Sequence, residues 1–275
     1  MTTQWIIDVM EAWAPSRWAM ETDNVGLLIG DRARPVSRVL TALDLSEDVL
    51  REAVHDHYDF IITHHPLITR HVQPINSITA DSALGKKLLT LIGCGIGLFC
   101  AHTNLDMAPG GVNDILFSRL GLIEKEPLIP PESPELPTLG LIGNLYQPMT
   151  LAALAEHVNQ TLSIKVVRYV GRGDLIVEKV GLCSGNGTQP QMLKAVLAKK
   201  CDVYITGDIG YHIAMDALEN GLALIDGTHY ATEIPIAEVI ANYIRQSAIN
   251  QGFELTVDRA KSDGQVFKST YDQPL

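Results

Sequence analysis

Two adjacent histidines are the first residues in the chain whose type and position suggest chemistry. His64 and His65 directly follow 59–63, a run with an apolar centre that predicts a buried strand. If the backbone stays extended beyond the strand, the two side chains diverge and suit two neighbouring metal ions better than one. Pro66 favours an extended backbone at His65. Taken alone, however, the pair would be interpreted as two solvent-facing loop histidines.

Two further motifs combine a histidine with a carboxylate four residues later. His102 and Asp106 form one, and His229 and Glu233 form the other. Residues at this spacing share one face of a helix. All three motifs follow predicted strands, and open α/β sheets bind their ligands at the carboxyl ends of strands. Together, the motifs predict a functional site.

The donor types predict which metals this site would hold. Imidazole and carboxylate ligands without cysteine suit Zn²⁺, Mn²⁺ or Fe²⁺ rather than Ca²⁺. If Glu233 bridges two ions, each ion has three protein ligands and open positions, as catalytic metal sites do. Two such ions would activate a shared water as hydroxide at neutral pH. Four metal charges less two carboxylates also leave a local excess of about +2 that could hold a phosphate.

The composition narrows the class of protein. The chain has 275 residues and a formal net charge of −11, which argues against binding a nucleic acid polymer. The longest apolar run, 88–101, is too short to span a bilayer, and the first twenty residues do not resemble a signal peptide. The four cysteines form no C-x-x-C pair and are expected to be reduced thiols. We therefore expect a cytoplasmic protein without a membrane partner.

Strand and helix patterns alternate along the chain, which predicts an α/β fold with mixed sheets flanked by helices. The run 202–206 matches 59–63 in residue type, and its neighbours also correspond, at an offset of roughly 125–145 residues. This pattern indicates two α/β domains from an internal duplication. The segment 126–137 contains five prolines and predicts a linker or domain crossing. We expect a metal-binding domain formed by 1–125 and 223–275, with a second domain, 126–222, inserted in it.

At this point the motifs resemble those of one family, the GTP cyclohydrolase 1 type 2 family, also called the NGG-interacting-factor-three-like proteins. The matching segments run in family order from residue 23 to 233, and jointly they are highly specific. They are Asp23-Asn24-Val25-Gly26-Leu27-Leu28, Thr63-His64-His65-Pro66, His102-Thr103-Asn104-Leu105-Asp106, Gly110-Gly111-Val112-Asn113, Ser184-Gly185-Asn186-Gly187, Ile205-Thr206-Gly207-Asp208 and His229-Tyr230-Ala231-Thr232-Glu233.

The resemblance implies two intertwined domains, a dinuclear metal site between them and a ring-shaped homohexamer. It implies His64, Asp106 and Glu233 as ligands of one ion, and His65, His229 and Glu233 as ligands of the other. The family often has Glu after Ile-Thr-Gly, where this chain has a shorter carboxylate. The large central insertion of some members is absent. The shorter carboxylate is Asp208, whose role the resemblance leaves open.

Several polar residues allow two interpretations. His102 is either a ligand or, as we favour, a donor that orients a carboxylate or bound water. Asp23 and Asn24 either cap a turn or face the site. The segment 184–187 is a plain turn or a phosphate cradle, and His212 either lies on a helix surface, as we favour, or approaches the site. Histidines without an expected role are His55, His57, His71 and His157.

The sequence supports two main functions. The first is a metal-dependent hydrolase that acts on a nucleotide or another phosphorylated heterocycle. If the family name applies, the bond attacked is at C8 of guanine in GTP, although no base-reading motif is visible. The second is a non-catalytic metal-binding scaffold or regulatory interaction protein, because family membership and chemistry are separate claims. Phosphoester hydrolysis is a third and weaker alternative.

Overall fold

The computed structural model divides the chain into two compact units, and each combines segments distant in sequence. Unit 1 contains Met1–Leu105 and Ile236–Val266, and unit 2 contains Asp106–Pro235 and Phe267–Leu275. The described residues are 1–69, 75, 77–131, 133 and 136–268. His71 and three positions of the proline-rich segment, 132, 134 and 135, therefore lie outside them.

The unit boundaries differ from those expected from the sequence. Residues 106–125 and 223–235 belong to unit 2, rather than to the domain that begins at residue 1. The reason is strand pairing, because residues 122–127 and 223–226 both form strands in the sheet of unit 2. The proline-rich segment then connects two strands of one sheet and does not cross between units.

Unit 1 contains a five-stranded sheet in the order β1-β4-β3-β2-β11. All neighbouring strands are parallel except β1, which pairs antiparallel with β4. The elements of unit 1 are α1 (Thr3–Trp13), β1 (Gly26–Ile29), β2 (Arg38–Ala42), α2 (Glu47–His55), β3 (Phe60–Thr63), α3 (Ala83–Cys94), β4 (Gly97–Cys100) and β11 (Thr256–Arg259), with a 3₁₀ turn at Ser16–Trp18. The unit boundaries fall inside two further helices, α4 (Thr103–Met107) and α10 (Pro235–Asn250).

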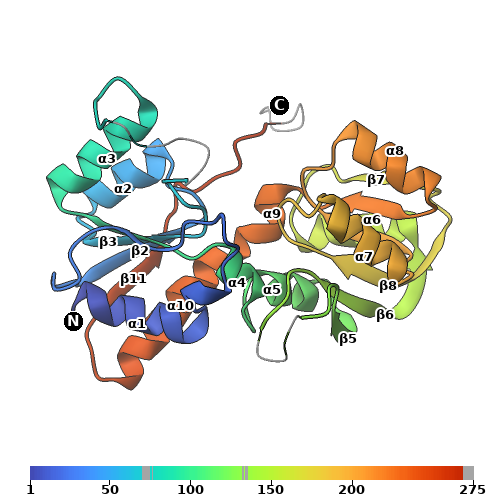
Figure 1. Cartoon of the computed structure of the whole chain (residues 1–275), viewed down its shortest axis with the longest axis horizontal. Coiled ribbons are helices and arrows are strands. Elements are labelled where there is room, and N and C mark those ends of the chain that lie inside the picture. The colour runs from blue at the N-terminus through green and yellow to red at the C-terminus, as the bar shows by residue number, and fades with distance from the viewer. Residues whose placement is uncertain (70–74, 76, 132, 134–135, 269–275) are drawn as a thin grey trace. The chain divides into compact units, whose positions relative to one another are not determined.

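Helices cover both faces of the unit 1 sheet (Figure 1). Alternate residues of a strand point to opposite faces, so Leu40 and Ile61 pack with Val49 of α2 and Leu91 of α3. On the other face, the Thr41 hydroxyl donates to the carbonyl of Ala237 in α10, at 2.7 Å. Because both faces are covered, β3 and β4 are buried along their whole length. Their last residues, Thr63 and Cys100, pair with each other.

Unit 2 contains a six-stranded sheet in the order β5-β6-β8-β9-β10-β7. Its central strands β8, β9 and β10 are parallel, and the others pair antiparallel with their neighbours. Its elements are α5 (Val112–Arg119), β5 (Leu122–Pro127), β6 (Leu141–Thr150), α6 (Leu151–Thr161), β7 (Arg168–Val170), β8 (Ile176–Leu182), α7 (Pro190–Ala198), β9 (Val203–Thr206), α8 (Tyr211–Glu219), β10 (Ala223–Asp226) and α9 (His229–Glu233).

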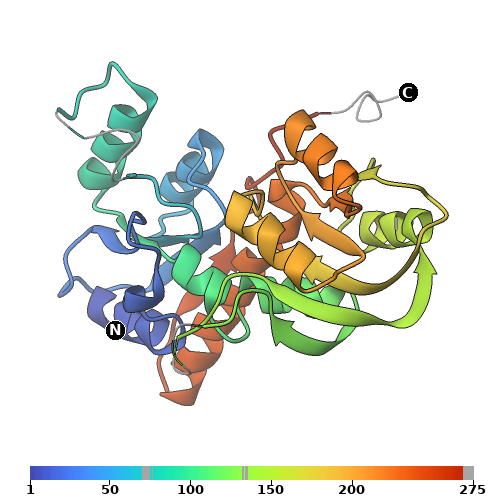
Figure 2. The same ribbon diagram turned by 45° about the vertical axis from the view of Figure 1, so that its right-hand side comes forward.

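The unit 2 sheet is also covered on both faces. Figures 1 and 2 show α7 and α8 together on one face and α6 on the other. Tyr204 and Leu224 belong to the α7–α8 side, where they pack with Val196 of α7. Ile205 and Ile225 point the opposite way and pack with α6. Both units are thus mixed α/β layers, as the sequence predicted.

The two sheets repeat one plan, which supports the predicted duplication. In unit 1, Asp59 precedes β3, and its carboxylate accepts hydrogen bonds from the backbone N–H groups of Ser37 and Arg38 at the start of β2. In unit 2, Asp202 precedes β9 and accepts from two consecutive N–H groups of β8 in the same way. A β-α-β-α-β order of parallel strands therefore occurs twice. In each copy an aspartate before the middle strand accepts hydrogen bonds from the backbone of the preceding strand.

Helix caps explain several element boundaries. The hydroxyl of Ser46 accepts from Val49 N, as the sequence predicted for the start of α2, and Ser82 and Thr150 cap α3 and α6 in the same way. Strands β6 and β11 were not expected. Among the described residues, no helix has both the length and the apolar character that crossing a membrane requires.

Candidate metal centre

Three histidines converge at the carboxyl end of the unit 1 sheet. His64 and His65 follow β3, and His102 follows β4 by two residues. The ends of the two strands are aligned because Thr63 pairs with Cys100. One ring nitrogen from each histidine lies within 4.8 Å of the others, and the ring centroids are 5.1 to 5.5 Å apart. These three histidines could therefore contribute ligands to a metal ion.

Each of these imidazoles is held through its Nδ1 atom. His64 donates to the carbonyl oxygen of Ala101 at 2.8 Å, and His65 donates to the Asp44 carboxylate at 2.9 Å. His102 donates to Asp23 at 2.9 Å. A neutral imidazole with its proton on Nδ1 has its lone pair on Nε2. Carboxylate and carbonyl partners of this kind are typical of metal-binding histidines, whose ring orientation they fix.

Asp23 has the second of the two expected roles, since it faces the histidine group. Its carboxylate accepts from His102 and from both the N–H and the hydroxyl of Thr103. Burial alone would raise its pKa, but the hydrogen bonds from His102 and Thr103 and the nearby imidazole charge hold the pKa well below its usual range. Asp23 is therefore an ionised acceptor that orients His102.

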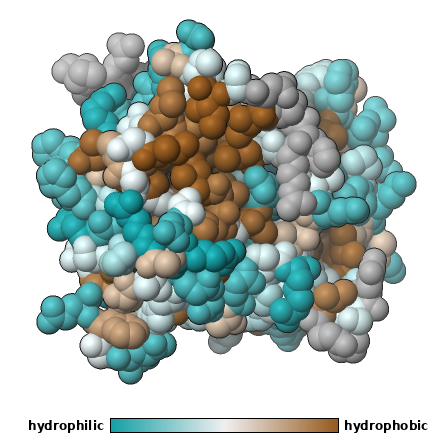
Figure 3. Space-filling model, turned by 60° about the vertical axis from the view of Figure 1, so that its left-hand side comes forward, coloured by the Kyte–Doolittle hydropathy of each residue, from teal (hydrophilic) through white to brown (hydrophobic). Residues whose placement is uncertain are grey.

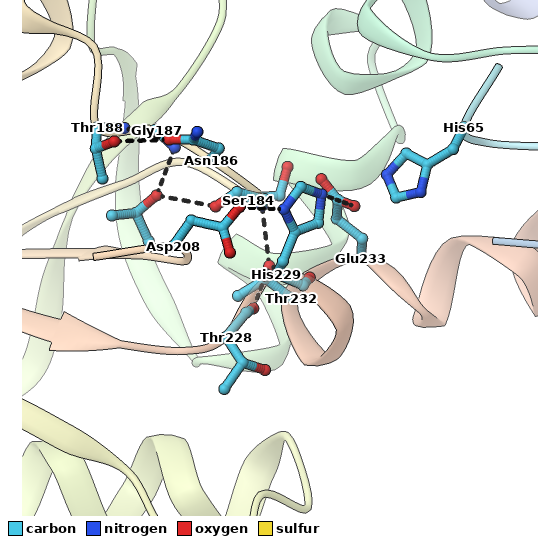
Figure 4. Close-up of polar contacts among 12 residues, drawn as sticks. His65, Ser184, Asn186, Gly187, Thr188, Asp208, Thr228, His229, Thr232 and Glu233 are labelled. Carbon is cyan, nitrogen blue, oxygen red and sulfur yellow. Dashed lines mark hydrogen bonds and ion pairs between the residues drawn. The ribbon is translucent and has the colours of Figure 1, made fainter. Parts of the chain in front are cut away.

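In unit 2, His229 and Glu233 share one face of α9, as their spacing predicted. Nε2 of His229 lies 3.1 Å from Oε2 of Glu233 (Figure 4). Neighbouring ligands that are each ~2.1 Å from one ion lie roughly 3.0 to 3.4 Å apart, so this separation fits two ligands of a shared cation. Glu233 is only 3% exposed, and a carboxylate at that depth is stable only when paired or coordinated.

Asp208 has a clear structural role that the sequence left open. Its carboxylate accepts the Nδ1 proton of His229 at 2.7 Å (Figure 4). Asp208 has a φ of 54°, a left-handed conformation that Asp adopts more readily than most residues. The contact leaves Nε2 of His229 facing Glu233, so Asp208 positions a candidate ligand.

Asp106 is also buried in unit 2, at 8% exposure. The side chain of Asn113 donates to its carbonyl oxygen at 3.0 Å and accepts from the backbone N–H of Ser184. The Ser184 hydroxyl lies 3.5 Å from Oδ1 of Asp106, a long contact. Asn113 thereby connects the start of unit 2 to the turn after β8.

The turn 184–187 is not a phosphate cradle in this conformation. Gly185 N donates to the hydroxyl of Thr232, and Gly187 N donates to the hydroxyl of Thr206. These N–H groups are already used inside the protein. Gly185 has a φ of 58°, and a Cβ there would overlap the carboxylate of Glu233. The turn therefore packs against the candidate ligand, and a side chain at position 185 would displace the Glu233 carboxylate.

The predicted ligands thus fall into two sets, one in each unit. His64 and His65 belong to unit 1, and Asp106, His229 and Glu233 belong to unit 2. His212 lies exposed on α8, which agrees with the favoured interpretation. The sequence did not predict the positioning carboxylates Asp44 and Asp208, because they lie 21 residues from the histidines they hold.

Comparison with known proteins identifies the family of the chain and agrees with its fold. Residues 1–264 match the profile of the family described as Duf34/NIF3 (NGG1p interacting factor 3). The chain belongs to this family. The resemblance inferred from the motifs is therefore confirmed.

Relatives match over nearly the full length. A Clostridium acetobutylicum protein named GTP cyclohydrolase 1 type 2 homolog is 32% identical over 92% of both chains. A Streptococcus pneumoniae protein of the same name is 36% identical over 92% of this chain and 93% of its own length. The crystal structure of a Bacillus cereus protein related to NIF3 has a TM-score of 0.88, is 27% identical, and covers 98% of this chain and 99% of its own.

Proposed function

We propose that this NIF3-family protein holds two divalent metal ions and uses them to hydrolyse a nucleotide or another phosphorylated heterocycle. One ion would be bound by His64, Asp106 and Glu233, and the other by His65, His229 and Glu233. The observation that carries the proposal is the orientation of the histidines, since each candidate donates its Nδ1 proton to a fixed acceptor. The division of ligands between ions comes from the family resemblance.

The donor set fits the proposed ions. It contains imidazoles and two buried carboxylates, Asp106 and Glu233, and no thiolate ligand. Such a set suits Zn²⁺, Mn²⁺ or Fe²⁺. The structure supports His102 as a third imidazole of the unit 1 group, so it remains a candidate ligand as well as a residue that orients water or a carboxylate.

When bound, two ions of this kind lower the pKa of water and polarise substrate oxygens. The residues of the chain have other tasks. Asp44, Asp23 and Asp208 fix the imidazole rings, and Gly185, which has no side chain, leaves room for the Glu233 carboxylate. With two ions the ligand set would be about +2 in charge, so we expect a small anionic substrate on this acidic protein.

The hydrolase proposal is supported by the names of the relatives, which compare them with a GTP cyclohydrolase. Such names transfer family membership more securely than chemistry. The alternative is a non-catalytic scaffold or regulatory interaction protein, which the same ligands would also suit. Hydrolysis of phosphoesters is compatible with the ligand set as well.

Turnover distinguishes these functions. Purified protein loaded with Zn²⁺, Mn²⁺ or Fe²⁺ would be offered GTP, other nucleotides and phosphodiesters. We expect metal-dependent product formation that Glu233→Ala abolishes, with two ions per chain by elemental analysis. Two bound ions without turnover on any substrate would favour the scaffold, and fewer than two ions in the wild-type protein would refute the dinuclear site.

We further propose that the protein is a homo-oligomer, a hexameric ring by analogy with the family. Figure 3 shows a large hydrophobic area on one face of the molecule. Exposed apolar side chains of unit 1 include Met20 and Ile78, and Leu89 and Ile92 one turn apart on α3. Apolar patches of this kind often mark subunit interfaces. Light scattering should report a hexamer, and Ile92→Glu should weaken its assembly. The cytoplasmic location stays a prediction from the sequence.

A further inference from the structure

Unit 2 contains a cavity that no ligand assignment so far explains. Its volume is about 270 Å³, and its wall comes from β7, β10, the loop after β9 and the start of α8. Arg168, Tyr169, Leu224 and Asp226 line it from the two strands, and Tyr211 lines it from α8. Small-molecule sites range from ~300 to 1,000 Å³, so this cavity has room for one ring system rather than a whole nucleotide.

The lining combines aromatic and apolar side chains with an ion pair. Tyr211 is 74% exposed, which leaves aromatic surface available for stacking. Arg168 forms an ion pair with Asp226 at one side of the cavity. A guanidinium has five N–H donors, and a carboxylate has about four acceptor positions. Because Asp226 accepts from Arg168 and from Thr228 N, both charged groups retain hydrogen-bonding capacity.

The cavity lies at the same edge of the sheet as the unit 2 metal ligands. Ile209, which lines it, directly follows Asp208. Asp226 ends β10, and His229 comes three residues later. A ligand in this cavity would therefore contact the same two strand ends that carry His229 and its positioning carboxylate.

We propose that this cavity binds a planar heteroaromatic ring of nucleobase size whose edge has an acceptor next to an N–H donor. The ring stacks on Tyr211, the acceptor receives a hydrogen bond from Arg168, and the N–H donates to Asp226. The inference deepens the proposed function by naming a base subsite for its substrate, and it rests on that function for its biological meaning. The binding itself does not need metal.

The test uses metal-free protein, prepared with a chelator, and inosine, which has the required edge and no phosphate. We expect a dissociation constant on the order of 1 mM by NMR titration, as for a ring of about ten heavy atoms. Ribose should not bind, and 1-methylinosine, which lacks the N–H, should bind several-fold more weakly. Tyr211→Ala should weaken inosine binding by at least about fivefold, since stacking on an aromatic side chain has at least that effect.

Tyr146→Ala is the matched control, because Tyr146 is also an exposed tyrosine of unit 2, at 81%, and lies outside the cavity lining. Equal effects of the two tyrosine variants on inosine binding would overturn the proposal. So would the absence of binding at an inosine concentration about 20-fold above the expected dissociation constant. Metal content measured separately distinguishes this failure from failure of the dinuclear site. A protein that binds two ions but no inosine would keep the metal proposal and lose the base subsite.

Discussion

Asp208 offers the sharpest test of the metal centre, because its proposed effect is entirely indirect. Its carboxylate holds Nδ1 of His229 at 2.7 Å. In Asp208→Asn the side chain keeps its size but loses its charge, so the imidazole is less basic and less firmly oriented. Losing such a partner typically lowers metal affinity 10- to 100-fold, or about 1.4 to 2.7 kcal/mol. Because the side chains of both residues are more than a third exposed, we expect the lower half of this range.

A competition titration against a fluorescent zinc chelator measures the two affinities separately. We expect Asp208→Asn to weaken only the ion bound by His229, with the other ion retained at its wild-type affinity. Asp208→Glu should recover much of the loss, because the longer carboxylate that the family often has at this position keeps the charge. Asp174→Asn serves as the control, since Asp174 is an exposed aspartate of unit 2 that pairs with Arg172.

The fold should tolerate Asp208→Asn, so the result has a clear interpretation. The positive φ of Asp208 is one that Asn also adopts readily, and the melting temperature should therefore change little. The reasoning is refuted if Asp208→Asn matches the control in both affinities, or if both ions weaken equally. In the first case His229 needs no positioning carboxylate, and in the second His229 does not belong to one ion.

Three further predictions concern the turn, the thiols and the acid stability of unit 1. Gly185→Ala should displace the Glu233 carboxylate and reduce bound metal below two ions per chain by elemental analysis, while Gly210→Ala, which has open space, should not. Only Cys94 is exposed among the cysteines, and burial raises the pKa of Cys201 to about 11. A thiol reagent at pH 8 should therefore label one cysteine in native protein and four after unfolding. Rapid labelling of a native Cys94→Ser variant would contradict this. Burial tends to raise the pKa of Asp59, but hydrogen bonds from Ser37 and Arg38 lower it overall. Its contribution to stability is therefore present above the unfolded pKa and lost as the pH falls through the folded pKa. Asp59→Asn should cost about 1 kcal/mol at pH 7 by urea unfolding and nothing below the folded pKa, and a difference that stays constant with pH would refute the assignment.

The sequence predicted the elements whose residues have one dominant environment. The β3 run is apolar because helices cover both faces of the sheet, so its end, and with it His64, could be located from the sequence alone. Strand β11 was missed because it is a short edge strand with the sequence Thr-Val-Asp-Arg, in which only Val257 is buried. The long strand β6 was missed because its second half, from Tyr146 to Thr150, is exposed or half-buried and contains a proline.

The positioning residues were harder to predict because they depend on tertiary contacts. Asp23 meets His102 from 79 residues away, through a loop without regular structure. The spacing of a ligand pair within one helix, such as His229 and Glu233, is local and can be read from the sequence. A carboxylate that approaches from another strand end has no such spacing, and its role becomes visible only when the strand order is known.

The repeated plan of the two units places different residue types at equivalent positions. Thr63 pairs with Cys100 in unit 1, and Thr206 pairs with Asp226 in unit 2, so the middle strands β3 and β9 end at corresponding points. Two residues later, unit 1 has His65 and unit 2 has Asp208. One copy of the position thus provides a candidate ligand and the other provides the carboxylate that orients one. Because the strand ends have the same register in both units, a single exchange of side chain could change a ligand into its support without any change in the fold.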